Sequence, residues 1–126
     1  MKKGYSVPGK ILLCDDDAGI VEAVQLILEL KGYEVVSLME GEDLFATLDS
    51  FSPDLILLDL WLSGISGEDI TKKLKSKTAT KNIPVVILSA NTQTCEISSA
   101  IGADDYVCKP FDIEELERVI KKYVAD

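Results

Sequence analysis

The apolar residues of this chain are concentrated in short runs that are separated by longer amphipathic segments. Four runs have the length of a strand, at residues 11–14, at Val35 and Val36 with Leu38, at 55–58 and at 85–88, and a weaker fifth covers 106–108. The first, third and fourth runs are continuously apolar, whereas a strand with one face in water would alternate. The pattern therefore predicts a parallel β-sheet with helices on both faces.

Between these runs, apolar residues recur at the spacing of an α-helix. Such segments precede Pro53, Pro84 and Gly102, and a further one follows Asp112. The start of this last segment is well marked, because Asp112 followed by Glu115 is typical of a helix cap. The clearest segment covers residues 18–31, and its expected buried stripe consists of Ile20, Val24, Ile27 and Leu28, with Val21 at the margin. Strands and helices therefore alternate as five βα units.

A chain of 126 residues, 47% of them hydrophobic, is long enough for one domain with a real core. Five βα units in this length predict a doubly wound three-layer α/β sandwich, because a closed eight-stranded barrel needs a longer chain. In such a sheet the functional site lies beyond the carboxyl ends of the strands. Candidate chemistry is therefore sought directly after each strand.

Polar residues of a distinctive kind follow the predicted strands: Asp15, Asp16 and Asp17 after the first, Asp59 after the third, Ser89 after the fourth and Lys109 after the fifth. If the first and third strands are neighbours, Asp15, Asp16 and Asp59 converge and repel one another unless a cation is present. Oxygen ligands without histidine or cysteine favour Mg²⁺, with Mn²⁺ as a substitute. We assign Asp17 to the N-cap of the following helix.

The composition excludes several function classes. The chain has no histidine, which excludes Ser-His-Asp and Cys-His catalysis and any phosphohistidine on this chain. Its three cysteines include no CxxC pair and predict neither a disulfide framework nor a zinc site, and we interpret Cys14 and Cys108 as small apolar strand residues. Neither a signal-peptide core nor a membrane-length run occurs, so we expect a cytoplasmic protein without a membrane partner.

The charge balance opposes nucleic acid as a direct partner. Asp and Glu number 22 against 13 Lys and Arg, a net charge of −9, which repels a phosphate backbone. One basic cluster interrupts this balance, and we interpret it as a solvated helix face and loop because no aromatic residues interleave with it. Its members are Lys72, Lys73, Lys75, Lys77 and Lys81.

Four stretches at the strand ends carry a resemblance to a known family: residues 12–17 (LLCDDD), 53–59 (PDLILLD), 84–90 (PVVILSA) and 102–111 (GADDYVCKPF). They resemble the motifs of the receiver domain of two-component response regulators, and the last stretch is very specific. The resemblance implies a receiver domain over residues 10–124, with an N-terminal extension at 1–9 and a C-terminal tail at 125–126. It also implies a flavodoxin-like (βα)₅ sandwich with strand order 2-1-3-4-5.

The resemblance further implies a function. The chain would accept a phosphoryl group on Asp59 from a phosphohistidine of a sensor histidine kinase or a histidine phosphotransfer protein, in a Mg²⁺-dependent transfer that it catalyses itself. Asp15, Asp16, Asp59 and the backbone carbonyl of Trp61 would bind the metal. Lys109 and Ser89 would contact phosphoryl oxygens, Ala90 would leave room for the group, and Tyr106 would move inward with Ser89. The altered surface would then bind an unknown protein target or a second copy.

Other functions remain to be weighed against a receiver domain, and the chain departs from the family pattern in two places. A haloacid-dehalogenase-type phosphatase needs a second Asp two residues after the nucleophile, and Trp61 stands there. A non-phosphorylatable receiver that acts only as a scaffold is disfavoured, because all five expected polar residues are present. A receiver excised from a longer kinase or regulator would look the same. We expect no fused output domain and no conventional turnover enzyme. Ser63 replaces the usual proline, and residues 91–99 predict a short fourth helix because they are poor helix formers.

Overall fold

The computed structural model describes residues 9–62, 65–90 and 101–124. Its five strands form one parallel sheet in the order β2-β1-β3-β4-β5, which confirms the predicted fold class and strand order. The elements are β1 (Lys10–Cys14), α1 (Ala18–Leu30), β2 (Glu34–Leu38), the 3₁₀ turn η1 (Gly41–Asp43), α2 (Leu44–Leu48), β3 (Leu55–Asp59), α3 (Gly67–Ser76), β4 (Val85–Ser89), β5 (Asp105–Cys108) and α5 (Ile113–Tyr123).

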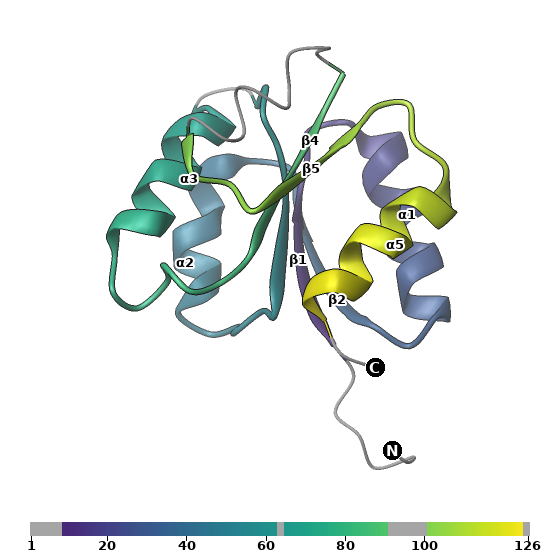
Figure 1. The fold of residues 1–126 in the computed structure, drawn as a ribbon, viewed down its shortest axis with the longest axis horizontal. Helices are drawn as coiled ribbons and strands as arrows, with labels where there is room; N and C mark the ends of the chain where they lie inside the picture. Colours follow the sequence, from purple (N-terminus) through teal and green to yellow (C-terminus); the bar gives the residue numbers. More distant parts are fainter. Residues whose placement is uncertain (1–8, 63–64, 91–100, 125–126) are drawn as a thin grey trace.

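Helices cover both faces of the sheet, as the continuous apolar runs predicted. Figure 1 shows the sheet edge-on, with α2 and α3 on one side and α1 and α5 on the other. Successive residues of β1 point to opposite sides, so Ile11 and Leu13 join the cluster under α1 and α5, whereas Leu12 joins the cluster under α2 and α3. Every residue of β3 and β4 is buried, which explains why their sequences do not alternate.

The strand ends differ slightly from the sequence expectation. Asp59 and Ser89 are the last residues of β3 and β4 rather than the first residues after them. The ladder continues past the apolar runs because the Leu60 amide donates to the Leu88 carbonyl at 3.1 Å. The Lys109 amide likewise donates to the Ser89 carbonyl at 2.8 Å, so the ends of β4 and β5 are held together.

The buried face of α1 is rotated from the predicted stripe. Val21, expected at the margin, is buried with Val24 and Leu28, whereas Ile20 and Ile27 are half-buried. The reason is that α1 packs against two neighbours. Val21, Val24 and Leu28 face the sheet, and Ile20 and Ile27 turn toward the segment that leads into α5.

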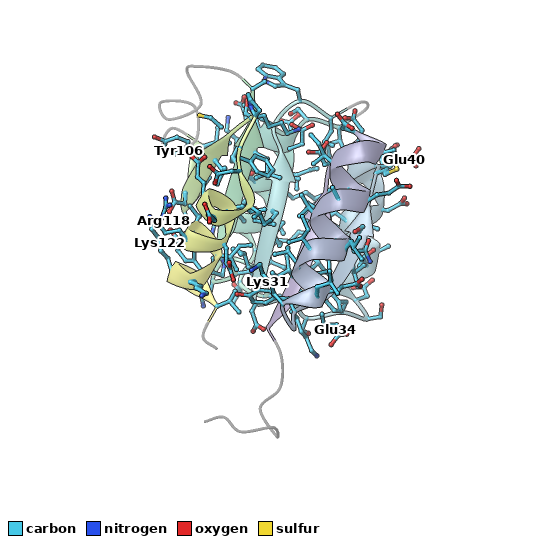
Figure 2. All side chains as sticks on the ribbon, turned by 90° about the vertical axis from the view of Figure 1, so that its right-hand side faces the viewer. Lys31, Glu34, Glu40, Tyr106, Arg118 and Lys122 are labelled. Carbon is cyan, nitrogen blue, oxygen red and sulfur yellow. The ribbon has the colours of Figure 1, made fainter. Side chains whose placement is uncertain are left out.

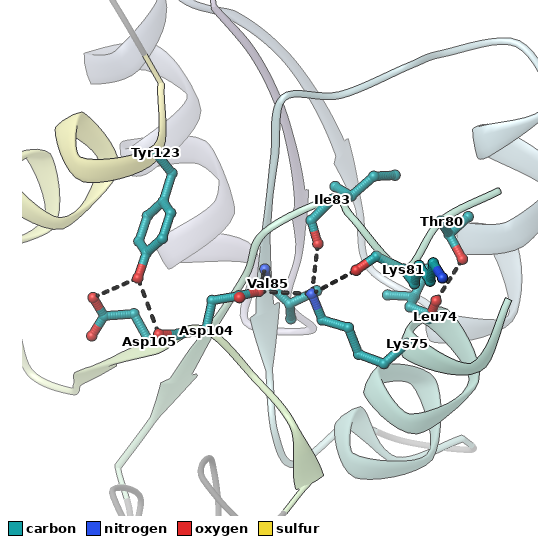
Figure 3. Close-up of polar contacts among 9 residues, drawn as sticks. All are labelled: Leu74, Lys75, Thr80, Lys81, Ile83, Val85, Asp104, Asp105 and Tyr123. Carbon is teal, nitrogen blue, oxygen red and sulfur yellow. Dashed lines mark hydrogen bonds and ion pairs between the residues drawn. The ribbon is translucent and has the colours of Figure 1, made fainter. Parts of the chain in front are cut away.

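One lysine of the predicted solvated cluster is not solvated. The Lys75 ammonium donates to the Ile83 carbonyl at 2.9 Å and the Lys81 carbonyl at 3.3 Å, and it pairs with the Asp104 carboxylate at 2.7 Å (Figure 3). It is drawn inward because the loop between α3 and β4 presents these carbonyls next to the start of β5. The interpretation as a solvated face was therefore wrong for Lys75.

The two described cysteines differ in environment. Cys14 is fully buried, as expected, and burial together with the nearby Asp15 and Asp59 charges raises its thiol pKa to about 12. This thiol therefore stays protonated at neutral pH, which agrees with a packing role. Cys108 is only half-buried, because it lies on the edge strand β5.

Some expectations lie outside the described residues. These are the N-terminal extension up to residue 8, Ser63, the fourth helix at 91–99 and the tail at 125–126. Within the described ranges, no helix has both the length and the apolar character needed to cross a membrane.

Candidate functional site

Three carboxylates converge at the carboxyl edge of the sheet. Asp15 and Asp16 follow β1, and Asp59 ends the adjacent strand β3, whose register pairs Cys14 with Leu58. One oxygen of each carboxylate lies within 4.8 Å of the others. The structure therefore brings together the three side chains that the sequence predicted to converge, in an arrangement suited to a cation.

Lys109 reaches the same pocket from the end of β5. Its ammonium lies 2.7 Å from Asp15 Oδ2 and 3.7 Å from Asp59 Oδ1, and the peptide bond that follows it, to Pro110, is cis. The ammonium thus forms an ion pair with the fully buried Asp15 and stands within reach of Asp59. One positive charge is shared between two carboxylates, which leaves the cluster with net negative charge.

The Asp15 carboxylate has one oxygen fixed by the backbone and one that is not. Asp15 Oδ1 accepts a hydrogen bond from the Asp17 amide at 3.0 Å. Within the described ranges Oδ2 accepts no hydrogen bond, and Lys109 contacts it as an ion-pair partner only. A buried carboxylate oxygen in this state has capacity for a metal ion.

The electrostatics of Asp59 follow from its position. Burial and the Asp15 charge raise its pKa above the ordinary value, while Lys109 and the Trp61 amide, 3.3 Å from Oδ1, act in the opposite direction. The net effect is upward because Asp59 is only 6% exposed and faces a like charge. The ionised form is thus destabilised, and an added cation would relieve this.

Asp17 plays the structural role that the sequence assigned to it. Its Oδ1 accepts hydrogen bonds from the amides of Gly19 and Ile20 at 3.0 and 3.2 Å, so it caps α1. Asp16 is exposed and stands between the buried Asp15 and this cap. The three consecutive aspartates therefore differ in exposure and in contacts, and only two of them belong to the carboxylate cluster.

The remaining predicted site residues surround the cluster. Ser89 is fully buried at the end of β4, opposite Cys108 in the sheet register and so beside Lys109, and Ala90 is exposed directly after it. Tyr106, labelled in Figure 2, is half-buried on the edge strand β5. It packs against the cluster under α2 and α3. Trp61 is 60% exposed beside the acceptor strand. The inward movement of Tyr106 and the metal role of the Trp61 carbonyl stay predictions.

Gly67 is a site residue whose role the sequence reasoning missed. It is the first residue of α3, with Ser66 as N-cap. A Cβ at this position would lie 2.4 Å from the Asp59 carbonyl oxygen and 2.8 Å from Leu60 Cα. The helix therefore begins directly against the backbone of the acceptor strand, which only glycine permits. A Ser-Gly pair before Glu and Asp was the available signal.

An apolar groove adjoins the cluster and was also not predicted. It has a volume of 440 Å³ and runs between α1 and the β5–α5 segment. Ile20, Ala23 and Ile27 form one wall, Phe111 and Ile113 the other, and Asp17 and Lys109 border it. The sequence contained no signal for this groove, because the helical spacing assigned Ile20 and Ile27 to the buried stripe of α1.

Comparisons with known proteins agree with this geometry. The profile of the response regulator receiver domain family matches residues 11–121. The chain is 36% identical to the DNA-binding response regulator MtrA of Mycolicibacterium paratuberculosis over 109 residues, which cover 85% of this chain and 47% of MtrA. The chain thus spans about half the length of the curated relatives that it matches.

Two solved structures extend the comparison. The chemotaxis response regulator CheY4 of Vibrio cholerae has a TM-score of 0.85 and 25% identity, covering 92% of this chain and 98% of that one. The receiver domain of the sensor histidine kinase PA1611 of Pseudomonas aeruginosa has a TM-score of 0.84 and 25% identity, covering 92% and 97%. In that structure a magnesium ion is coordinated in the active-site cleft.

Proposed function

Because the chain belongs to the response regulator receiver domain family, which matches residues 11–121, we propose that it accepts a phosphoryl group on Asp59. The donor is a phosphohistidine on a sensor histidine kinase or a histidine phosphotransfer protein. The observation that carries the proposal is the arrangement of the Lys109 ammonium, 2.7 Å from Asp15 and 3.7 Å from Asp59, at the edge where the carboxylates converge. This arrangement places positive charge beside a buried nucleophile.

The transfer itself requires little acid-base chemistry. A carboxylate oxygen of Asp59 attacks phosphorus, the new O–P bond forms, and the P–N bond to the donor imidazole breaks, with its electron pair remaining on nitrogen. The transition state is loose, so positioning and charge neutralisation dominate. Lys109 pairs with a phosphoryl oxygen, Ser89 donates a hydrogen bond to another, and Ala90 leaves space for the group.

The residues present fit a hard divalent cation. Asp15, Asp16 and Asp59 offer carboxylate oxygens within 4.8 Å of one another, and Asp15 Oδ2 accepts no hydrogen bond from the described residues. Such oxygens suit Mg²⁺, and Mn²⁺ has similar ligand preferences. The Trp61 carbonyl would be a further ligand. When bound, the ion would supply positive charge against the phosphoryl oxygens.

The phosphodonor docks on the groove beside Lys109. The groove is lined mainly by apolar residues of α1 and the β5–α5 segment and borders the ion pair that Lys109 makes with Asp15. Leu26 and Leu30 add exposed apolar surface on the outer side of α1, at 59% and 78% exposure. An amphipathic helix that carries the phosphohistidine can cover these residues while it presents its imidazole to Asp59.

Phosphorylation then changes the interaction surface. Ser89 is buried next to Lys109, and Tyr106 lies half-buried on β5, the edge strand that Lys109 follows, so a movement of Ser89 toward the phosphoryl group opens space for Tyr106. The output is contact with a protein target or a second copy. The relative MtrA is named as DNA-binding, but this chain has a net charge of −9, which disfavours direct contact with nucleic acid.

The experiment is intact-mass spectrometry after incubation with Mg²⁺ and acetyl phosphate or phosphoramidate. We expect the gain of one phosphoryl group, lost in Asp59→Ala and in the presence of a chelator. Asp49→Ala, an exposed aspartate at the end of α2, serves as the matched control and should be modified like the wild type. The protein modifies itself once and is not a conventional turnover enzyme, so the product is stoichiometric. Modification of Asp59→Ala, or none in the wild type, would refute the proposal.

A further inference from the structure

A second groove lies at the end of the sheet where the parallel strands begin, opposite to the carboxyl end that carries Asp59. It has a volume of 580 Å³ and is bordered by α2, the C-terminal end of α3 and the segments that lead into β3 and β4. Because these segments enter strands of five residues, the groove is about 17 Å from the carboxylate cluster along the strands. Four half-buried apolar side chains line this α2–α3 groove: Phe45, Leu48, Phe51 and Ile83.

Two lysines stand over one aromatic ring of the α2–α3 groove. The ammonium groups of Lys73 and Lys77 lie 4.9 and 5.0 Å from the centroid of the Phe45 ring. Both are exposed, and in the described part of the chain neither forms an ion pair with a carboxylate. The ring holds both charges at the mouth of an apolar groove, where they remain available to an external anion.

Lys73 lies in α3 and Lys77 is its C-cap, and the loop that follows is held by internal hydrogen bonds. The Thr80 hydroxyl donates to the Leu74 carbonyl at 2.7 Å, and the Lys81 amide donates to the Lys77 carbonyl at 2.8 Å. Lys75 closes the loop from inside by donating to the carbonyls of Lys81 and Ile83 (Figure 3). The backbone that carries Lys73 and Lys77 is therefore already ordered before a ligand binds. Binding then costs little conformational entropy, which favours affinity.

The charge around the α2–α3 groove contrasts with the rest of the chain. Residues 72–81 contain five lysines and no acidic residue, in a protein of net charge −9. A nucleic acid would be repelled by the remaining surface, and the ammonium groups of Lys73 and Lys77 lie over the Phe45 ring, where a base would otherwise stack. A short acidic segment avoids both obstacles, because it meets Lys73 and Lys77 beside the apolar side chains of the groove, whose lining includes one acidic residue, Asp49.

We propose that the α2–α3 groove binds an acidic polypeptide segment of a partner protein. A bulky apolar side chain of the segment inserts among Phe45, Leu48 and Phe51, and flanking carboxylates pair with Lys73 and Lys77. This site is separate from the phosphoacceptor pocket, so its occupancy does not require phosphorylation of Asp59.

The test uses the full chain labelled with ¹⁵N and a short peptide of glutamates around a central leucine. We expect chemical-shift changes confined to residues 45–53 and 73–83, and weaker binding at higher ionic strength. Lys73→Gln with Lys77→Gln should weaken binding about tenfold, since each pairing is a modest surface interaction. Lys31→Gln with Lys121→Gln removes the same charge from the opposite face, where both lysines pair with Glu117, and should change binding less than about twofold.

Further binding experiments separate an acidic peptide from a nucleic acid or a second copy of the chain as the ligand of this groove. A peptide with glutamine for glutamate, or alanine for the leucine, should bind at least about tenfold more weakly. Asp59→Ala should bind the acidic peptide like the wild type, which keeps this test independent of phosphoryl transfer. Equal binding of a single-stranded DNA of the same charge, shifts outside the groove, or equal losses in the two lysine variants would overturn the proposal. So would self-association of the unliganded chain through these residues, seen by sedimentation.

Discussion

Among single residues, Asp59 shows how position changes the chemistry of an ordinary side chain. Asp59 and Asp54 lie near the two ends of one strand, but Asp54 is exposed, whereas Asp59 is buried beside Asp15. Burial and the neighbouring charge raise the pKa of Asp59. A raised folded-state pKa means that the folded protein binds the proton more tightly, so its ionisation lowers stability as pH rises above the ordinary value of 3.8.

We therefore expect Asp59→Asn to raise the free energy of unfolding at pH 7 in metal-free buffer, because the variant has no charge to bury beside Asp15. The gain should shrink as pH falls from the raised folded-state pKa toward 3.8, and it should vanish well below 3.8, because the wild-type carboxyl group is then neutral in both states. Urea denaturation at several pH values measures it. Asp49→Asn, on the exposed end of α2, should shift stability by no more than about 0.5 kcal/mol. A destabilised Asp59→Asn variant at neutral pH would contradict the electrostatic account.

Among the elements, α3 is held at both of its ends by close contacts. Its first residue, Gly67, lies against the backbone of β3, and Lys75 in its last turn bonds the loop before β4 and the start of β5. The sequence predicted a helix before Pro84, but it showed neither contact. Both contacts join segments that are distant along the chain, and hydrophobic spacing contains no information about such pairs.

Gly67→Ala should destabilise the protein by about 1–3 kcal/mol, because the added methyl group meets backbone atoms that have no room to move. It should also slow phosphorylation by acetyl phosphate, since the end of β3 carries Asp59. Gly19→Ala in α1 is the control. Its Cβ meets only Asp17 Oδ1 at 3.4 Å, so better helix propensity should leave stability equal or higher by up to about 1 kcal/mol. Thermal unfolding of both variants measures these changes in stability. Equal destabilisation by Gly67→Ala and Gly19→Ala would refute the close-contact argument.

Lys75→Met should lower the free energy of unfolding by about 1–3 kcal/mol, because Asp104 and two carbonyls lose their donor. Lys72→Met, one helical turn before Lys75, removes only an exposed ion pair with Glu68. It should change the free energy of unfolding by less than about 0.5 kcal/mol. Hydrogen exchange of the Val85 amide, which donates to Asp104, should accelerate in the first variant alone. An unchanged exchange rate of the Val85 amide in Lys75→Met would show that Lys75 does not stabilise the contact between Asp104 and the start of β4.

For the whole molecule, one sheet joins two apolar clusters and assembles the site at its edge. The carboxylates come from β1 and β3, the hydroxyl from β4 and the ammonium from the end of β5. Four strand ends therefore have to be in place at once before the pocket exists. Ligand binding at this edge is linked to global folding for that reason.

Mg²⁺ should consequently raise the free energy of unfolding, by about 1.4 kcal/mol for each tenfold increase above its dissociation constant. Trp61, the single tryptophan, lies beside Asp59 and reports both binding and unfolding by fluorescence. Asp59→Asn should lose most of this dependence. NaCl at matched ionic strength is the control, and an equal stabilisation by NaCl would mean that screening rather than a bound ion is responsible.

The sequence by itself determined the alternation of strands and helices, the two-faced burial of the sheet and the identity of the polar residues at the strand ends. These properties follow from local periodicity and from the fixed direction of parallel strands. Only the tertiary structure decided how α1 is rotated, why position 67 is glycine, that Lys75 turns inward and that two grooves exist. Each of these depends on which distant segments meet, and such contacts are set by packing in three dimensions.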